Sequence, residues 1–413
     1  MTVHASSAPP IAAGLHPGDP APRSILEEVR SLYVHIPFCE RKCEYCDFMS
    51  VAGTAGEHEY VAALRDEIRV LGRQLPGVRL ETIFVGGGTP SLIDPELLAS
   101  VASEIRCSFD VAPGAEITLE ANPSSTTRER ARAWLGAGFN RVSIGVQSLE
   151  PDILTFLGRV HDPGRALAAV EEVRAAGFES INCDLIYAVP ALDDVRWQRT
   201  VQRIADVAPG HVSCYELTVE PGTPLHTAVR RGRVTTCDPE FALVQHRIAM
   251  ETLAAAGYAQ YEVSNFARPG RECRHNLAYW SNAYYVAAGV GAHGHIPAAA
   301  APALGIAAEP GAVSTRYWHG RGIAAFVAAV RDGFVPIRGS EPVGAEMRER
   351  ERIMLGLRLR SGVSLESDAS LREARDLAAA GLLVLDGRVT RTTRDGEALL
   401  NAVTLRLTSG MFS

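Results

Sequence analysis

The sequence of 413 residues has little lysine and no long hydrophobic run. Lys42 is the single lysine among 41 basic residues, and the formal net charge is −7. The chain therefore has no overall basic field for binding phosphates, and its composition does not favour nucleic acid as a partner. The alanine-rich stretch from Ile296 to Val313 is broken by Pro297, Gly305 and Glu309, so we expect no membrane span.

A secretory leader pattern is also missing, because the chain does not begin with a basic start and a hydrophobic run. The first 24 residues are rich in Ala, Pro and Ser, and we predict a disordered tail over residues 1–30. The eight cysteines do not resemble the dense framework of a small secreted domain. A reducing, cytoplasmic location is therefore expected.

Short β-branched or aromatic runs alternate with helical patterns from about Ser31, which is typical of βα units around a parallel sheet. The predicted strands are Leu32–Ile36, Glu81–Val85, Ala115–Glu120, Arg141–Val146, Ser180–Ile186 and His211–Leu217. The predicted helices are Glu59–Leu71, Pro95–Arg106, Thr127–Leu135, Pro163–Ala176 and Asp194–Val207. The pattern predicts an α/β fold, with a partial (β/α)6 barrel over residues 31–237 whose chemistry gathers at the carboxyl ends of the strands.

The regular alternation ends near Asp238, and residues 238–413 are predicted as a separate C-terminal region with a smaller α/β domain at its end. The expected elements are helical Pro239–Ala256, strand-like Gln260–Val263, irregular Asn265–Gly294, and helical Ile323–Arg331 and Gly344–Arg360.

The strongest chemical signal is Cys39-Glu-Arg-Lys-Cys43-Glu-Tyr-Cys46, directly after the first predicted strand. Thiolates are the natural ligands of iron–sulfur clusters, and three from one loop can bind three irons of a four-iron cluster. The fourth iron then stays open to a chelating amino-carboxylate, such as the methionyl end of S-adenosylmethionine. The alternative is a structural zinc site, which needs four ligands and would use His35 or Asp47 as the fourth.

A second motif, Val85-Gly86-Gly87-Gly88-Thr89, follows at the end of the second strand. Its glycines allow the backbone to approach a ligand closely, although a tight strand-to-helix turn is an equally good explanation. The motif fits neither a P-loop nor a dinucleotide fingerprint.

Polar residues recur at or after later strand ends, at Glu120, Gln147, Arg159 and Asp184. Any one of them alone is more often a satisfied polar group or a cap. Their recurrence at positions where the barrel rule expects ligand contacts favours a binding role.

The cysteine spacing and the glycine motif together resemble the radical-SAM superfamily. With Leu32-Tyr-Val-His-Ile-Pro-Phe-Cys39 before them, they resemble the family of oxygen-independent coproporphyrinogen III oxidase, from about Leu32 to near Leu407. The resemblance implies a [4Fe-4S] cluster on Cys39, Cys43 and Cys46. It also implies S-adenosylmethionine contacts from Tyr33, Tyr45, Gly87, Gly88, Thr89, Glu120, Gln147, Arg159 and Asp184.

Two features indicate a branch of that family. The oxidase follows its third cysteine with Gly-Cys, whereas this chain has Cys46-Asp47-Phe48. The segment Arg274-His-Asn-Leu-Ala-Tyr-Trp280 resembles the signature of heme chaperones of the HemW type. Imidazole ligates heme iron, which makes His275 the candidate heme ligand, with His293 and His295 equally available. A structural corner at His275 is the alternative.

The leading hypothesis is a heme chaperone that binds the cluster, S-adenosylmethionine and heme and passes heme to client hemoproteins. One alternative is the oxidase itself, which the missing fourth cysteine disfavours, and another is a zinc-stabilised binding protein. Whether the chain is an enzyme, forms a homodimer or touches a membrane surface stays open. The family's Asp-Leu-Ile-Tyr-Gly-x-Pro-Gly is changed at Ala188 and Ala191, and Met49 stands where the family favours Asn.

Overall fold

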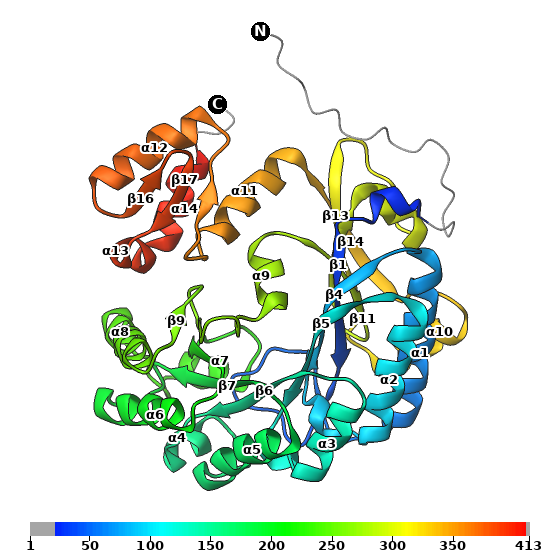
Figure 1. Ribbon diagram of the computed structural model, residues 1–413, viewed down its shortest axis with the longest axis horizontal. Helices are drawn as coiled ribbons and strands as arrows, with labels where there is room; N and C mark the ends of the chain where they lie inside the picture. The colour runs from blue at the N-terminus through cyan, green and yellow to red at the C-terminus, as the bar shows by residue number, and fades with distance from the viewer. Residues whose placement is uncertain (1–20, 410–413) are drawn as a thin grey trace.

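The computed structural model describes residues 21–409, and its centre is a curved sheet of twelve strands (Figure 1). The strand order is β14-β13-β12-β11-β1-β4-β5-β6-β7-β8-β10-β9. The sheet is open, with β14 at one edge and β9 at the other. Figure 1 shows α1, α2, α3, α5 and α6 along the outer side of this arc.

Six parallel strands lie next to one another in the sheet in the same order in which they occur in the chain, which confirms the predicted βα units. They are β1 (Val29–Ile36), β4 (Arg79–Gly87), β5 (Asp110–Ala121), β6 (Arg141–Gln147), β7 (Ser180–Tyr187) and β8 (His211–Glu216). The first six residues of β6 are all buried, as expected for a parallel strand covered on both faces. The carboxyl ends of the six strands therefore share one edge of the sheet.

The outer helices begin at recognisable caps. Asp94, Asp162 and Asp238 each precede a proline and accept a backbone N–H of the first helical turn, which fixes the start of α2, α5 and α8. The helices of this part are α1 (Glu57–Gln74), α2 (Pro95–Ser108), α3 (Arg128–Gly136), α4 (Pro151–Phe156), α5 (Pro163–Ala176), α6 (Asp194–Val207), α7 (Pro224–Arg230) and α8 (Pro239–Ala255). Short 3-10 turns are η1 (Arg23–Ile25), η2 (Pro90–Leu92) and η3 (Pro123–Ser125).

The sheet continues on both sides of the six strands. Beyond β1 lie β11 (Tyr284–Ala288), β12 (His293–Pro297), β13 (Ala312–His319) and β14 (Ile337–Gly344), and beyond β8 lie β10 (Asn265–Ala267) and β9 (Ala259–Gln260). The helices α9 (Arg274–Trp280) and α10 (Ile323–Arg331) and the 3-10 turn η4 (Ala298–Leu304) connect them. The main sheet thus reaches residue 344, beyond the boundary predicted at residue 237.

The prediction that Asn265–Gly294 is irregular is wrong, because β10, α9 and β11 lie within it. Four of the five residues of β11 are buried, and the strand pairs in parallel with β1. A buried run this short has no periodicity by which a sequence pattern identifies it.

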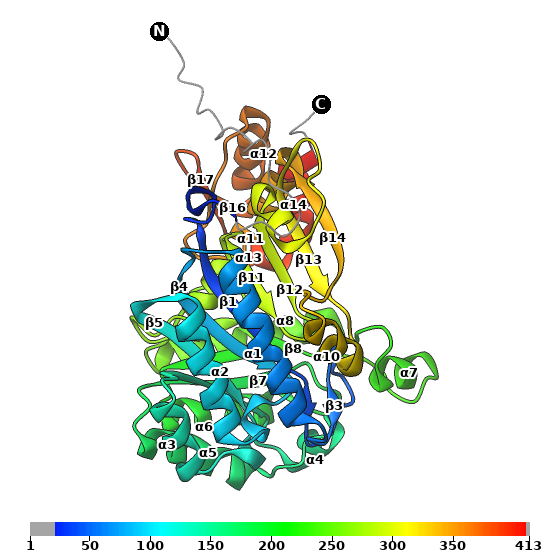
Figure 2. The same cartoon turned by 90° about the vertical axis from the view of Figure 1, so that its right-hand side faces the viewer.

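A second hydrophobic cluster lies at the end of the chain and includes Ile353, Leu365, Leu377 and Leu407. The elements of this C-terminal module are α11 (Ala345–Gly356), β15 (Val363–Ser364), α12 (Asp368–Ala379), β16 (Leu383–Asp386), β17 (Val389–Thr392), α13 (Arg394–Ala398) and α14 (Leu400–Ser409). Of these, α11, β15, α12, β16 and α14 contribute residues to the cluster. Figure 2 shows this C-terminal module at one end of the molecule and β3 (Val51–Ala52) toward the other, with α7 projecting to the side.

The predicted tail is too long at its C-terminal end. Residues 1–20 lie outside the described residues, but Ala21 and Leu26 are buried in the main core and Val29 begins β1. Across residues 21–409, we find no helix that combines the length and the apolar character needed to cross a bilayer.

Candidate cofactor site

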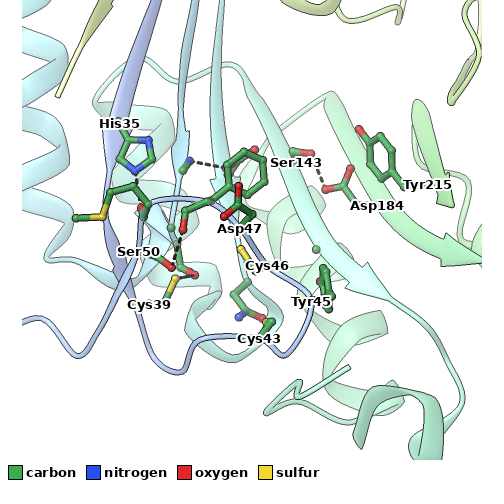
Figure 3. A pocket seen from close by; sticks show the side chains of 18 of the residues that line it. His35, Cys39, Cys43, Tyr45, Cys46, Asp47, Ser50, Ser143, Asp184 and Tyr215 are labelled. Atoms are coloured by element: carbon green, nitrogen blue, oxygen red, sulfur yellow. Dashed lines mark hydrogen bonds between the residues drawn. The ribbon is translucent and has the colours of Figure 1, made fainter. Parts of the chain in front are cut away.

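One cavity of about 870 Å³ lies at the carboxyl ends of the parallel strands. Its size falls within the range of about 300–1,000 Å³ that is usual for cofactor pockets. All twelve residues predicted for the cluster and S-adenosylmethionine line it: Cys39, Cys43, Cys46, Tyr33, Tyr45, Gly87, Gly88, Thr89, Glu120, Gln147, Arg159 and Asp184. Figure 3 shows the cavity with the three cysteines, Tyr45 and Asp184 labelled. The structure therefore brings together residues that are spread over more than a third of the sequence.

The cysteine loop is held to the glycine turn by main-chain hydrogen bonds. The loop starts with β2 (Phe38–Cys39), which pairs with β3. The amide of Thr89 donates to Phe38 O at 2.7 Å, and the amide of Gly88 donates to Ile36 O at 2.8 Å. These bonds fix the start of the cysteine loop against the end of β4.

The glycine turn leaves no space for side chains. Gly87 has φ +112°, and a Cβ there would lie 2.3 Å from the Cε1 atom of His35. A Cβ on Gly88 would lie 2.8 Å from the carbonyl oxygen of Phe38. The motif is thus a tight turn and also a cavity wall made of bare backbone.

Two of the three thiols accept hydrogen bonds from cavity side chains. Thr89 Oγ1 donates to Cys39 Sγ at 3.6 Å, and Arg159 Nη1 donates to Cys43 Sγ at 3.5 Å. Burial raises the pKa of Cys46 to about 11 and also raises that of Cys39. A bound metal must therefore displace their protons, as metal ligation by thiols requires.

The two candidates for a fourth zinc ligand, His35 and Asp47, make other contacts. His35 Nε2 donates to Met49 O at 2.7 Å, and its Nδ1 consequently accepts from the Tyr33 hydroxyl at 3.0 Å. Asp47 pairs with Arg321 at 3.8 Å. Among residues 21–409, no three His, Cys, Asp or Glu side chains are arranged around a single ion. Each cysteine of a four-iron cluster binds a different iron, so this donor set fits a cluster better than one zinc ion.

Arg159 carries a positive charge that no carboxylate in residues 21–409 neutralises. Its Nη2 donates to Asn122 Oδ1 and to Gly145 O, both at 2.9 Å, and its buried Nε has no partner. An unpaired guanidinium beside Cys43 favours an anion in the cavity, which fits a thiolate-bound cluster or a ligand carboxylate.

Two carboxyl groups, on β5 and β7, also line the cavity. Glu120 Oε2 accepts from the Gly87 amide at 2.9 Å, and burial raises the pKa of Glu120 to about 7. Asp184 accepts from Ser143 Oγ at 2.9 Å and from Asn182 Nδ2 at 2.8 Å, and burial raises its pKa as well (Figure 3). Groups of this kind can accept ligand hydroxyls or balance a cationic centre.

Gln147 ends β6 with φ +67°, a left-handed conformation that is uncommon outside glycine. The register between β6 and β7 shifts between Gly145 and Gln147. A bulge of this kind redirects a side chain at a strand end and is frequent next to binding sites.

The sequence interpretation missed an aromatic wall of the same cavity, formed by Phe84, Tyr279 and Tyr285. The Phe84 ring stacks on that of Tyr33 with centroids 6.3 Å apart, because the two residues are register partners on β4 and β1. Side chains alternate between the two faces of a strand, and this alternation along the two predicted strands is the signal that would have placed Tyr33 and Phe84 side by side on one face. Tyr285 was missed because its strand was predicted as irregular.

The structure does not support His275 as a heme ligand. Its side chain is fully buried, Nδ1 lies 2.8 Å from Thr82 Oγ1, and Nε2 lies 3.0 Å from the Tyr279 hydroxyl. Burial lowers the pKa of His275 to about 3. Both ring nitrogens are therefore used inside the fold, as the structural-corner alternative requires, while Asn276 and Tyr279 of the same motif line the cavity.

The other two histidine candidates differ from each other. His295 is buried, and its Nε2 lies 2.9 Å from Ser314 Oγ. His293 is exposed and lines the cavity.

Comparison with known proteins identifies the family of the chain. The model of the radical SAM superfamily matches residues 33–204. The heme chaperone HemW of Mycobacterium tuberculosis is 38% identical over 378 residues, covering 90% of this chain and 93% of the relative. HemW of Bacillus subtilis is 32% identical over 390 residues, covering 91% and 98%. The mitochondrial radical S-adenosyl methionine domain-containing protein 1 of Bos taurus is 35% identical over 411 residues, covering 95% and 90%.

Among solved structures, coproporphyrinogen III oxidase (HemN) from Escherichia coli, a radical SAM enzyme, superposes with a TM-score of 0.77. The two are 20% identical, and the superposition covers 94% of this chain and 92% of the oxidase. This likeness shows a shared fold. On the identity and coverage of its relatives, the chain belongs to the HemW heme chaperone family of the radical SAM superfamily.

Proposed function

We propose that this protein is a heme chaperone that holds a [4Fe-4S] cluster and S-adenosylmethionine, binds heme and transfers it to client hemoproteins. The observation that carries the proposal is that all twelve predicted cofactor residues line the same cavity, in a chain that is 38% identical to a named heme chaperone.

Cys39, Cys43 and Cys46 would each bind one iron. A cluster bound there supplies an open iron for the methionyl group of S-adenosylmethionine and an electron for its sulfonium centre. Arg159 and Thr89 donate hydrogen bonds to the cysteine sulfurs, which lowers the cost of their negative charge. Glu120 and Asp184, which line the same cavity, would accept ribose hydroxyls or balance the sulfonium.

The oxidase function is not our proposal, because Asp47 and Phe48 follow Cys46 in place of the Gly-Cys of the oxidase. We expect the protein to lack coproporphyrinogen III oxidase activity.

Anaerobic reconstitution followed by iron, sulfide and zinc analysis tests the cluster. We expect about four iron atoms and acid-labile sulfide per chain, and loss of both in Cys39→Ser. Cys107→Ser is the matched control, because Cys107 is exposed and lies outside the cavity. Zinc without sulfide would instead support the zinc-stabilised alternative.

Hemin titration of the same preparation tests the chaperone function. We expect stoichiometric binding, transfer of the heme to an added heme-free hemoprotein, and no turnover of coproporphyrinogen III. Absence of heme binding by both the apo and the reconstituted protein would refute the proposal, and turnover with production of deoxyadenosine would establish the oxidase.

A further inference from the structure

An exposed imidazole stands at the cofactor cavity without a role. His293 begins β12, lines the cavity and is exposed. In residues 21–409 neither of its ring nitrogens has a hydrogen-bond partner, in contrast to His275 and His295. A histidine free at both nitrogens can offer one of them to a metal.

The ring of His293 is held in place from one side. Trp318 is its register partner on the antiparallel strand β13, and the two rings stack with centroids 6.0 Å apart and an interplanar angle of 24°. Partial burial and the charge of Arg321 lower the pKa of His293, so the imidazole is neutral at neutral pH. The neutral form is the one that ligates iron.

The surroundings of His293 match the other parts of a heme molecule. Phe48 borders the same cavity with 65% of its surface exposed, so its ring is available to a flat apolar ligand. Arg321 also borders the cavity, and its side chain is 66% exposed. Heme combines a flat apolar ring, an iron that accepts imidazole, and two carboxylates that a guanidinium can pair with.

Two contacts connect this imidazole to the cysteine loop. Arg321 pairs with Asp47, the residue after Cys46, at 3.8 Å. Met49 lies against Gly291, where an added Cβ would come within 2.7 Å of the Met49 Cβ. The chain segments that would hold the cluster and the exposed imidazole are therefore in direct contact.

We propose that His293 is the axial ligand of the heme iron, that Trp318 orients its imidazole, and that Arg321 pairs with a heme propionate at the mouth of the cofactor cavity. This inference rests on the proposed heme binding and names the site at which it takes place. It assigns to the exposed histidine the role that the sequence signature suggested for His275.

Hemin titration of the full-length chain tests the inference, with the absorption spectrum and the affinity as readouts. His293→Ala should weaken hemin binding by about tenfold or more and shift the Soret band, since loss of even a residue that supports a metal ligand costs about 10- to 100-fold. Added imidazole should restore the wild-type spectrum. Arg321→Gln should weaken binding while leaving the Soret position unchanged.

His58→Ala is the matched control, because His58 is exposed on α1 and lies outside the cavity. Wild-type spectrum and affinity in His293→Ala would overturn the inference and leave the proposed function intact. Equal losses in the His58 and His293 variants would overturn it too. Failure of the wild-type chain to bind hemin would overturn the proposed function itself.

Discussion

Replacing Ala191 with glycine should stabilise this protein. Ala191 has φ +70° in the loop that follows β7, at a position where the related family has glycine. An L-residue in this left-handed region is disfavoured by about 1–2 kcal/mol, because its Cβ crowds the following carbonyl oxygen. Glycine has no Cβ and adopts this conformation freely. The side chain of Ala191 is exposed, so the substitution removes no buried apolar surface.

The expected gain in the free energy of unfolding is the strain energy that is relieved, minus the free-energy cost of the extra conformational entropy that glycine gives the unfolded chain. That entropy corresponds to about 0.4–1 kcal/mol, which leaves a net gain in the free energy of unfolding of roughly 1 kcal/mol. The hydrogen bond that Arg196 donates to Ala191 O at 2.9 Å is retained, because its acceptor is the main chain. Ala188 is a less suitable site, since it is buried with φ +55° and its methyl group contributes packing.

Urea unfolding followed by circular dichroism measures the effect, with Ala137→Gly as the matched control. Ala137 caps the C-terminus of α3 with φ −73°, a conformation that suits alanine, and packs against the main core, so glycine there should cost at least about 0.4–1 kcal/mol. The two variants should thus move in opposite directions. If both are destabilised equally, strain at Ala191 is not the property that distinguishes the two sites.

Three further predictions concern buried titratable groups. Because burial raises the pKa of Glu120 to about 7, affinity for S-adenosylmethionine should fall about tenfold between about pH 8 and about pH 6. The Glu120→Gln variant should bind S-adenosylmethionine weakly and with little pH dependence, and isothermal titration at the two pH values measures both effects. Burial alone would lower the pKa of His319, but the Glu67 carboxylate, 2.6 Å away, outweighs burial and raises this pKa. The ion pair therefore contributes its full stability below about pH 6.5 and loses it as the pH rises through the pKa of His319 in the folded protein. Glu67→Gln should therefore cost roughly 3 kcal/mol in urea unfolding at about pH 6 and less at about pH 9, and a constant difference would contradict this ion pair. His275→Ala removes the partner of the Tyr279 hydroxyl and one of the two partners of the Thr82 hydroxyl, which keeps its hydrogen bond to Ser31, so it should lower the free energy of unfolding by about 1–3 kcal/mol. The heme spectrum of the folded variant should be unchanged, and loss of that spectrum would return His275 to the heme site.

The parts of the site that could be predicted from the sequence are those in local motifs at strand ends. Gly87 ends β4, Cys39 follows β1, and Glu120 and Asp184 lie in the carboxyl-terminal halves of β5 and β7. The order of these strands in the sheet is their order in the chain, so the barrel rule brings the four residues to one mouth. The structure places them on one cavity, while their individual roles stay predictions.

The parts that could not be predicted depend on contacts between distant segments. A motif shows which residues occur together but not which of them faces the cavity, and in the signature around His275 the neighbouring Asn276 and Tyr279 face it instead. The strand that contains Tyr285 is defined by its pairing with β1, which no local pattern encodes.

The pairing of β1 with β11 has a consequence for how the protein is made. Val29 is the register partner of Tyr284, and synthesis of the chain between them must be completed before these two interior strands of the sheet can pair. The ribosome therefore presents the cysteine loop long before the wall with Tyr279 and Tyr285 exists. In a nascent chain this side of the cavity would therefore stay open, with the three thiols accessible, until β11 pairs with β1. Contacts of such long sequence separation also predict slow final folding.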